Sequence, residues 1–276
     1  MADSGVELRP PSTVRGWLLA LLRSTRPMSS LVPGTLSCAA VFARNGFSVR
    51  GILAGLAMYA LAAFGFQVND VLDFRKDRAA GVERPIASAI LSRQTALLFA
   101  LALLLLTFGV SAFVGCGGRV LAATALALIL YTPTARQLPL IKGFYVAALC
   151  VAPLYYGSVV SGVPYRWPPY VLVAVFIAGR EAFMDSNEIE DDRCAGMATI
   201  AAVIGETRTK RIATCIMALS MAVLAAVAAG GIAKAAAIAA LVSLLCVFIW
   251  PRLDDRKRVE LSRIPMLAAA VALACG

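Results

Sequence analysis

Long runs of apolar residues, separated by short polar segments, recur along the whole chain. Most of these runs approach the length of about 20 residues that a helix needs to cross a bilayer, so they predict membrane-spanning helices. We predict nine such segments, at residues 27–43, 51–69, 95–114, 119–133, 143–161, 168–186, 212–230, 232–250 and 264–276. The last is shorter than a full crossing, so it is either an incomplete span or begins a few residues earlier.

Composition agrees with this pattern. Hydrophobic residues make up 60% of the chain and charged residues 15%, against about 25% charged residues in soluble domains. We therefore predict an all-α integral membrane protein with about nine transmembrane helices in a single domain, residues 27–276. Residues 1–26 mix acids, prolines and four arginines before the first apolar run, unlike a cleavable signal peptide, and we expect an interfacial N-terminal segment.

The distribution of basic residues predicts the orientation of these spans. Of the 26 Lys and Arg residues, twenty fall on one side of the predicted membrane and five on the other. Cytoplasmic loops carry the excess of positive charge, which places the N-terminus inside. We expect the cell membrane of a prokaryote. The net charge of +10 then indicates attraction to anionic lipid or substrate, not to nucleic acid.

The available side chains limit the chemistry. The chain has no histidine, which excludes histidine-based triads, metal sites and proton relays. Its seven cysteines are scattered without paired spacing and suggest neither a zinc site nor a disulfide framework. Any reaction must use carboxylates, Arg, Lys, Tyr or a bound metal.

Ten of the sixteen acids gather in two short stretches that the predicted topology places at the cytoplasmic ends of the second and sixth spans. Each stretch contains three acids offset by three and seven positions, so on a helix they share one face. The two sets are Asp70, Asp73 and Asp77, then Asp185, Glu188 and Asp192. The helix dipole disfavours negative charge at a C-terminal end, so a cation is needed there, and Mg²⁺ prefers clustered carboxylates.

An ordinary alternative is that both clusters are solvated helix ends with surface ion pairs. Between them, however, lie Tyr131, Arg136 and Lys142, which are donors suited to phosphate oxygens on the same predicted side. Together these groups suggest a metal–diphosphate site.

These stretches resemble the motifs of the UbiA-type intramembrane prenyltransferase superfamily. Residues 69–77 match its NDxxDxxxD motif and are followed by the pair Arg84-Pro85, while residues 180–199 match its later acidic motif. Arg26-Pro27 is similar to the family's entry into the first helix. Glu188 departs from the pattern, because many members have Asp there.

The resemblance implies a helical bundle around a central cavity with a cytoplasmic cap, in which Mg²⁺ helps a prenyl diphosphate to lose its diphosphate and a small lipophilic acceptor captures the allylic group. The implied metal ligands are Asp70, Asp73, Asp77, Asp185, Glu188 and Asp192. The implied catalytic residues are Asp70, Asp73 and Asp192. The implied substrate-binding residues are Asn69, Arg26, Tyr131, Arg136 and Lys142.

Several outcomes stay open at this point. The leading expectation is an aromatic or other lipophilic acceptor; a terpene cyclase or a phosphoribosyl transferase on the same fold are alternatives. A cation transporter is disfavoured because both acidic clusters lie on one predicted side of the membrane. The acceptor, the prenyl chain length and the oligomeric state do not follow from the sequence.

Overall fold

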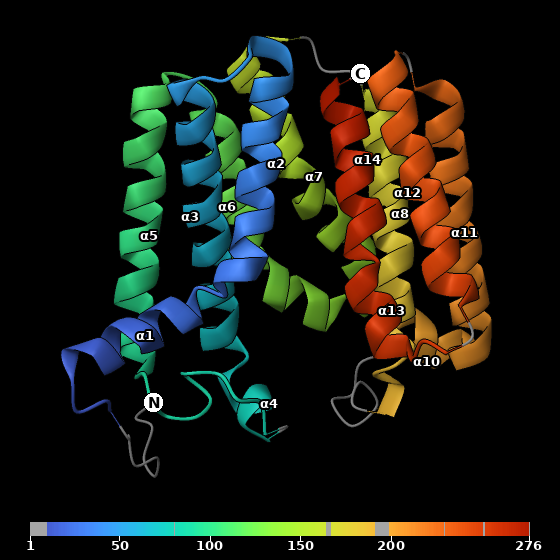
Figure 1. Ribbon diagram of the computed structural model, residues 1–276. Helices are drawn as coiled ribbons and strands as arrows, with labels where there is room; N and C mark the ends of the chain where they lie inside the picture. The colour runs from blue at the N-terminus through green and yellow to red at the C-terminus, as the bar shows by residue number, and fades with distance from the viewer. Residues whose placement is uncertain are drawn as a thin grey trace. The chain divides into compact units, whose positions relative to one another are not determined.

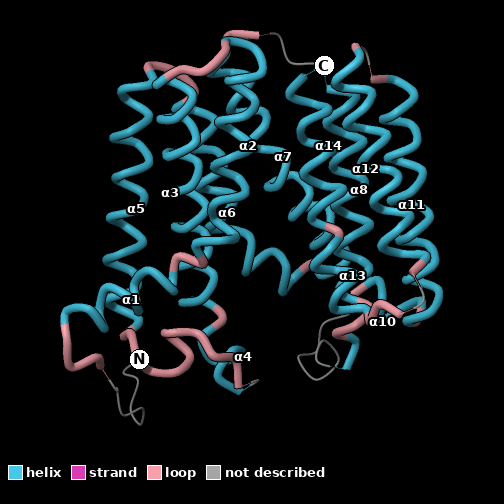
Figure 2. The backbone as a smooth tube through the Cα atoms, viewed as in Figure 1, coloured by secondary structure: helices cyan, strands magenta, loops and turns pink. Residues whose placement is uncertain are grey.

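The computed structural model describes residues 10–79, 81–163, 167–190, 199–228, 230–250 and 252–275. Within these residues the chain forms helices joined by turns and loops, and no strand (Figures 1 and 2). The helices are α1 (Val14–Ser24), α2 (Pro27–Asn45), α3 (Val49–Leu72), α4 (Phe74–Ala79), α5 (Arg93–Val114), α6 (Gly118–Gln137), α7 (Lys142–Ser161), α8 (Trp167–Asp185), α10 (Ile200–Ile204), α11 (Glu206–Val227), α12 (Gly231–Ile249), α13 (Asp255–Leu261) and α14 (Arg263–Cys275), with a short 3₁₀ helix, η1 (Pro139–Ile141).

Each of the nine predicted apolar segments coincides with one helix to within a few residues, which confirms the all-α prediction. Six helices in the described part of the chain, α3, α5, α6, α7, α11 and α12, are long and apolar enough to cross a membrane. The helix of the last segment, α14, has 13 residues, fewer than a full crossing needs. A total of nine crossings therefore stays a prediction.

The chain divides into two compact units, and each is described by itself. The first comprises Met1–Cys38 and Val49–Thr132, and the second Ala39–Ser48 and Pro133–Gly276. In the first unit, α3 packs along α5, and its N-terminal half meets α2 at Gly34 and Gly55. A Cβ atom added at Gly34 would lie 2.9 Å from the carbonyl oxygen of Gly55, so the backbones touch.

A small apolar cluster holds the far end of α3 in the first unit. Its buried members come from α1, from the α3–α4 junction, from the loop at 81–92 and from α5: Ala20, Val71, Phe74, Ile86, Leu91 and Ala96. Helix α1 contacts α3 and runs crosswise to it (Figure 1). The segment that carries the first acidic cluster is therefore fixed by packing on several sides.

In the second unit, α8 packs against α7 and α11, while α12 packs against α11 and α14. Helices α8 and α11 approach closely at Gly179, where an added Cβ would lie 3.2 Å from the carbonyl oxygen of Ala213. Figure 1 shows α8, α11, α12 and α14 running side by side. This packing positions the C-terminal end of α8, where the second acidic cluster begins.

Candidate functional site

The first acidic cluster lies across a break between two helices. Helix α3 ends at Leu72, Asp73 occupies a bend, and α4 begins at Phe74, so the expectation of one continuous helix was wrong. The backbone N–H of Asp73 still donates to the carbonyl oxygen of Asn69 (2.8 Å), and that of Asp77 to Asp73 (2.9 Å). Helical hydrogen bonding thus passes through the bend.

Two arginines pair with Asp70 and Asp77 of this cluster. The carboxylate of Asp70, with 2% of its side chain exposed, pairs with the guanidinium of Arg26 and, at 3.0 Å, with Nη1 of Arg84. The same Arg84 nitrogen lies 2.5 Å from Oδ2 of Asp77. Asp70 and Asp77 therefore come together around one shared cation, although seven positions separate them.

The backbone of Arg84 is held in place by the loop around it. The carbonyl oxygen of Arg84 accepts from the N–H of Ser88, and that of Pro85 accepts from Ile90 and Leu91. The N–H of Val82 donates to the carbonyl oxygen of Asp77, which ties the loop to the end of the acidic cluster. The sequence pattern included Arg84 beside the motif but gave no sign that its side chain would bridge two of the acids.

Arg26 occupies a strained position at the junction of α1 and α2. Its φ of 47° lies in the left-handed region, which costs a non-glycine residue about 1–3 kcal/mol. The guanidinium carbon lies 4.8 Å from the centre of the Phe66 ring, an arrangement that favours a cation. Two positions before Arg26, the hydroxyl of Ser24 accepts a hydrogen bond from the buried side-chain amide of Gln67 on α3. These contacts direct Arg26 toward Asp70.

Asn69, which is predicted to bind substrate, is oriented by Thr132, a residue that the sequence pattern did not indicate. The hydroxyl of Thr132 donates to Oδ1 of Asn69 at 2.8 Å. Thr132 follows Tyr131 directly on α6, and both lie in the polar end of an otherwise apolar helix, which was the available signal. Arg136 also belongs to α6, but its side chain lies outside the described part of the structure.

In the second unit, α8 ends at Asp185, the first acid of the second cluster. Nζ of Lys142, the first residue of α7, lies 2.6 Å from Oδ1 of Asp185, and both side chains are largely buried. Glu188 lies beyond the helix end and is exposed, while Asp192 lies outside the described residues. From this cluster, the structure therefore brings Asp185 together with Lys142, a residue predicted to bind diphosphate.

Hydrogen bonds of Arg180 hold α8 about one turn before Asp185. Arg180 lies 3.0 Å from Oε1 of Glu181, and its Nε donates to the hydroxyl of Ser262 at 2.8 Å. Ser262 lies between α13 and α14. The hydrogen bond to Ser262 connects α8 to the C-terminal helices, whereas the pair of Arg180 with Glu181 lies within α8.

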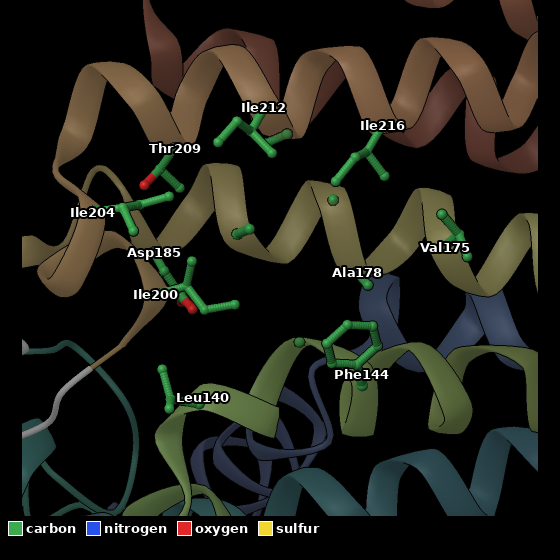
Figure 3. A pocket seen from close by; sticks show the side chains of 14 residues that line it. Leu140, Phe144, Val175, Ala178, Asp185, Ile200, Ile204, Thr209, Ile212 and Ile216 are labelled. Carbon is green, nitrogen blue, oxygen red and sulfur yellow. The ribbon is translucent and has the colours of Figure 1, made fainter.

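An apolar cavity of about 160 Å³ lies beside Asp185 in the second unit. It is lined by residues of α7, α8, α10 and α11, with Leu140 of η1. Figure 3 shows Asp185, Ile200 and Leu140 at one end of the cavity, and Val175 and Ile216 at the other. Asp185 and Thr209 are its polar members, so the cavity suits an apolar group.

Within the described residues, no three acidic or cysteine side chains form a group that could hold a metal ion by themselves. The carboxylates of Asp70, Asp77 and Asp185 form ion pairs with arginine and lysine side chains instead. The assignment of the six acids as metal ligands stays a prediction.

Comparison with known proteins agrees with the motifs. Digeranylgeranylglyceryl phosphate synthase of Methanoregula boonei is 33% identical over 208 residues, 72% of this chain and 73% of that protein. The enzyme of the same name from Thermococcus gammatolerans is 27% identical over 93% of this chain and 96% of its own length.

Solved structures show the same fold. A UbiA homolog from Archaeoglobus fulgidus, bound to DMAPP and Mg²⁺, superposes with a TM-score of 0.72 and 19% identity, covering 93% of this chain and 98% of that one. A UbiA homolog from Aeropyrum pernix gives a TM-score of 0.71 and 17% identity, over 90% of this chain and 96% of its own. The sequence model of the UbiA prenyltransferase family matches residues 30–271. The chain is therefore a membrane-embedded member of the UbiA prenyltransferase family.

Proposed function

We propose that this protein transfers an isoprenoid group from a prenyl diphosphate to the hydroxyl of a glyceryl phosphate lipid, in a reaction that requires Mg²⁺. The observation that carries the proposal is the pairing of Asp70 and Asp77 around one cation, with Arg26 beside them. Support for the acceptor class comes from the relatives named digeranylgeranylglyceryl phosphate synthase.

The first acidic cluster fits a divalent cation. Its donors are carboxylate oxygens, which Mg²⁺ prefers, and two of them already hold a positive group between them. Asp70, Asp73 and Asp77 would be its ligands in the first unit. Bound there, Mg²⁺ would neutralise charge that develops on the departing diphosphate.

In the second unit we propose Asp185, Glu188 and Asp192 as further carboxylate ligands. Lys142 supplies a point charge for phosphate oxygens, and its amino group is already directed at Asp185. Arg136 and Tyr131 are proposed as further donors to the diphosphate, and we expect all these groups on the cytoplasmic side.

The reaction breaks the bond between the allylic carbon and the bridging diphosphate oxygen, and the electron pair leaves with the diphosphate. A lone pair of the acceptor hydroxyl forms the new carbon–oxygen bond, and the hydroxyl proton passes to the released diphosphate. Arg26, beside the first acidic cluster, would stabilise the negative charge on a diphosphate that leaves from this cluster, because cationic donors act strongly where water is scarce. Asn69, fixed by Thr132, orients a phosphate oxygen.

Turnover by purified protein in nanodiscs tests this function. Mg²⁺ and geranylgeranyl diphosphate are supplied with a prenylated glyceryl phosphate, with 4-hydroxybenzoate or with no acceptor, and products are identified by mass spectrometry. An ether-linked lipid product with the first acceptor is expected. Prenylated 4-hydroxybenzoate as the main product would contradict the acceptor class, and a cyclised hydrocarbon without acceptor would indicate a terpene cyclase.

Variants connect the activity to the first cluster. Asp70→Asn should reduce turnover by roughly 10²- to 10³-fold, since it removes charge from the proposed metal site. Glu83→Gln is the matched control, because Glu83 is an exposed acid directly beside Arg84. Equal activity of Asp70→Asn and Glu83→Gln would contradict the role of Asp70.

A further inference from the structure

Basic side chains pair with three of the carboxylates proposed to bind metal. Arg26 and Arg84 pair with Asp70, Arg84 also pairs with Asp77, and Lys142 pairs with Asp185 in the second unit. A metal ion that bridges the same two oxygens, Oδ1 of Asp70 and Oδ2 of Asp77, would have to lie where the Arg84 nitrogen now lies. Two cations repel strongly at such short distances in a partly buried site, so they cannot both stay there.

Arg84 and Arg26 differ in how freely each can leave. The side chain of Arg84 is 29% exposed, and its guanidinium pairs with Asp70 and Asp77. Its backbone is fixed, so only the flexible side chain has to move. The guanidinium of Arg26, in contrast, also lies over the ring of Phe66, and its backbone is followed by the rigid Pro27.

We propose that Arg84 is a displaceable cation of the first acidic cluster. It holds Asp70 and Asp77 together before metal binds, and it transfers from these carboxylates to the diphosphate when metal takes its place, while Arg26 stays. This inference rests on the proposed function, because it assumes that metal and diphosphate bind at this cluster.

The movement of Arg84 from the carboxylates to the diphosphate makes the binding of metal and the binding of diphosphate cooperative. Metal binding alone has to break two ion pairs of Arg84, and diphosphate restores a partner to the released guanidinium. Each ligand therefore raises the affinity of the other by the same factor, as linkage requires. The two ion pairs of Arg84 also offset the repulsion between Asp70 and Asp77, so these carboxylates can lie close together without a metal ion.

The first test measures metal affinity without diphosphate and without turnover. Mn²⁺ is titrated into detergent-purified protein, and free Mn²⁺ is followed by its electron paramagnetic resonance signal. Arg84→Gln should bind Mn²⁺ roughly tenfold more tightly than the wild type, because nothing has to be displaced. Arg78→Gln is the control: it removes a charge beside Asp77, but that guanidinium lies over Phe74, so its effect should be small. Unchanged or weaker Mn²⁺ binding by Arg84→Gln would overturn the inference.

A double variant shows whether the tighter Mn²⁺ binding of Arg84→Gln arises at Asp70. In Asp70→Asn/Arg84→Gln the tighter binding should disappear, and thermal unfolding of each variant shows that it is folded. If Asp70→Asn binds Mn²⁺ as the wild type does, no metal binds at this cluster, and the proposed function fails together with the inference. If Asp70→Asn weakens binding but Arg84→Gln does not strengthen it, only the inference fails.

A second measurement tests the transfer of Arg84 to diphosphate. Labelled pyrophosphate is followed by equilibrium dialysis at a saturating concentration of free Mn²⁺. Arg84→Gln should bind pyrophosphate more weakly than the wild type although it binds metal more tightly. Equal pyrophosphate affinity would show that Arg84 only competes with metal, and would overturn the transfer.

Discussion

The hydroxyl of Thr132 donates a 2.8 Å hydrogen bond to the side-chain oxygen of Asn69. This contact joins α6 to the last turn of α3 within the first unit. Since the side-chain oxygen of Asn69 accepts from Thr132, its amide nitrogen points elsewhere and can donate to another group. Thr132 thus fixes which end of Asn69 meets a ligand.

Thr132→Val should therefore lower activity without unfolding the protein. Valine keeps the shape of threonine but removes the donor, so Asn69 can rotate, and we expect a loss of roughly tenfold in kcat/KM. Thr132→Ser, which keeps the hydroxyl, should restore most of it. Steady-state kinetics measures both variants, and equal losses in the two would show that the hydrogen bond has no role.

Lys142→Met should destabilise the second unit. Asp185 would keep a buried charge without its cation, which costs on the order of 3–5 kcal/mol when pairs are fully buried and less here, because 18% of the Lys142 side chain is exposed. The thermal midpoint in detergent should fall. Lys142→Met/Asp185→Asn should recover part of the loss, and a midpoint for Lys142→Met equal to that of the wild type would contradict the pairing.

Asp255 should make stability depend on pH. Burial acts to raise the pKa of Asp255, but hydrogen bonds and positive charge from Lys210 and Arg258 outweigh it and hold the pKa below its ordinary value of 3.8. The stabilisation is present above pH 3.8 and is lost as the pH falls through the folded-state pKa. The difference in thermal midpoint between wild type and Asp255→Asn should therefore shrink on acidification, and a difference that grows would contradict this assignment.

Gly34→Ala should weaken the contact between α2 and α3. The new Cβ would lie 2.9 Å from the carbonyl oxygen of Gly55, and separating the backbones costs about 1–3 kcal/mol. Gly109→Ala is the control, because no atom lies within 4 Å of a Cβ added there. Thermal unfolding should separate the two variants, with the loss confined to Gly34→Ala.

The N-terminal helix α1 should lie in the membrane interface. Val14, Leu18 and Leu22 follow one another at helical spacing and are 77%, 62% and 51% exposed. An exposed apolar stripe of this kind is typical of helices that bury one face among lipid headgroups. An environment-sensitive fluorophore on Leu18→Cys, in a variant stripped of its other reactive cysteines, should report an apolar surrounding in nanodiscs. A water-like emission there would contradict interfacial binding.

The apolar periodicity and length of each run predicted the helices well, because burial in lipid demands long apolar segments that leave a plain signal. The spacing of the acids also identified the residues that gather, namely Asp70 with Asp77. The break at Asp73 was not predicted, because an end of regular helix depends on the tertiary contacts of Val71 and Phe74 as much as on propensity. The bridging by Arg84 and the bond from Thr132 are long-range contacts, and spacing along one helix carries no record of them.

The helix break at Asp73 also limits how far this motif can be moved to another protein. Asp70 is held by the long helix α3, whereas Asp77 belongs to a six-residue helix tied to the following loop through Val82. A graft of residues 67–77 alone would carry the acids but leave behind both the loop and its arginine. A graft would therefore have to include the loop through Leu91, and it would still lack Arg26, which reaches Asp70 from the junction of α1 and α2.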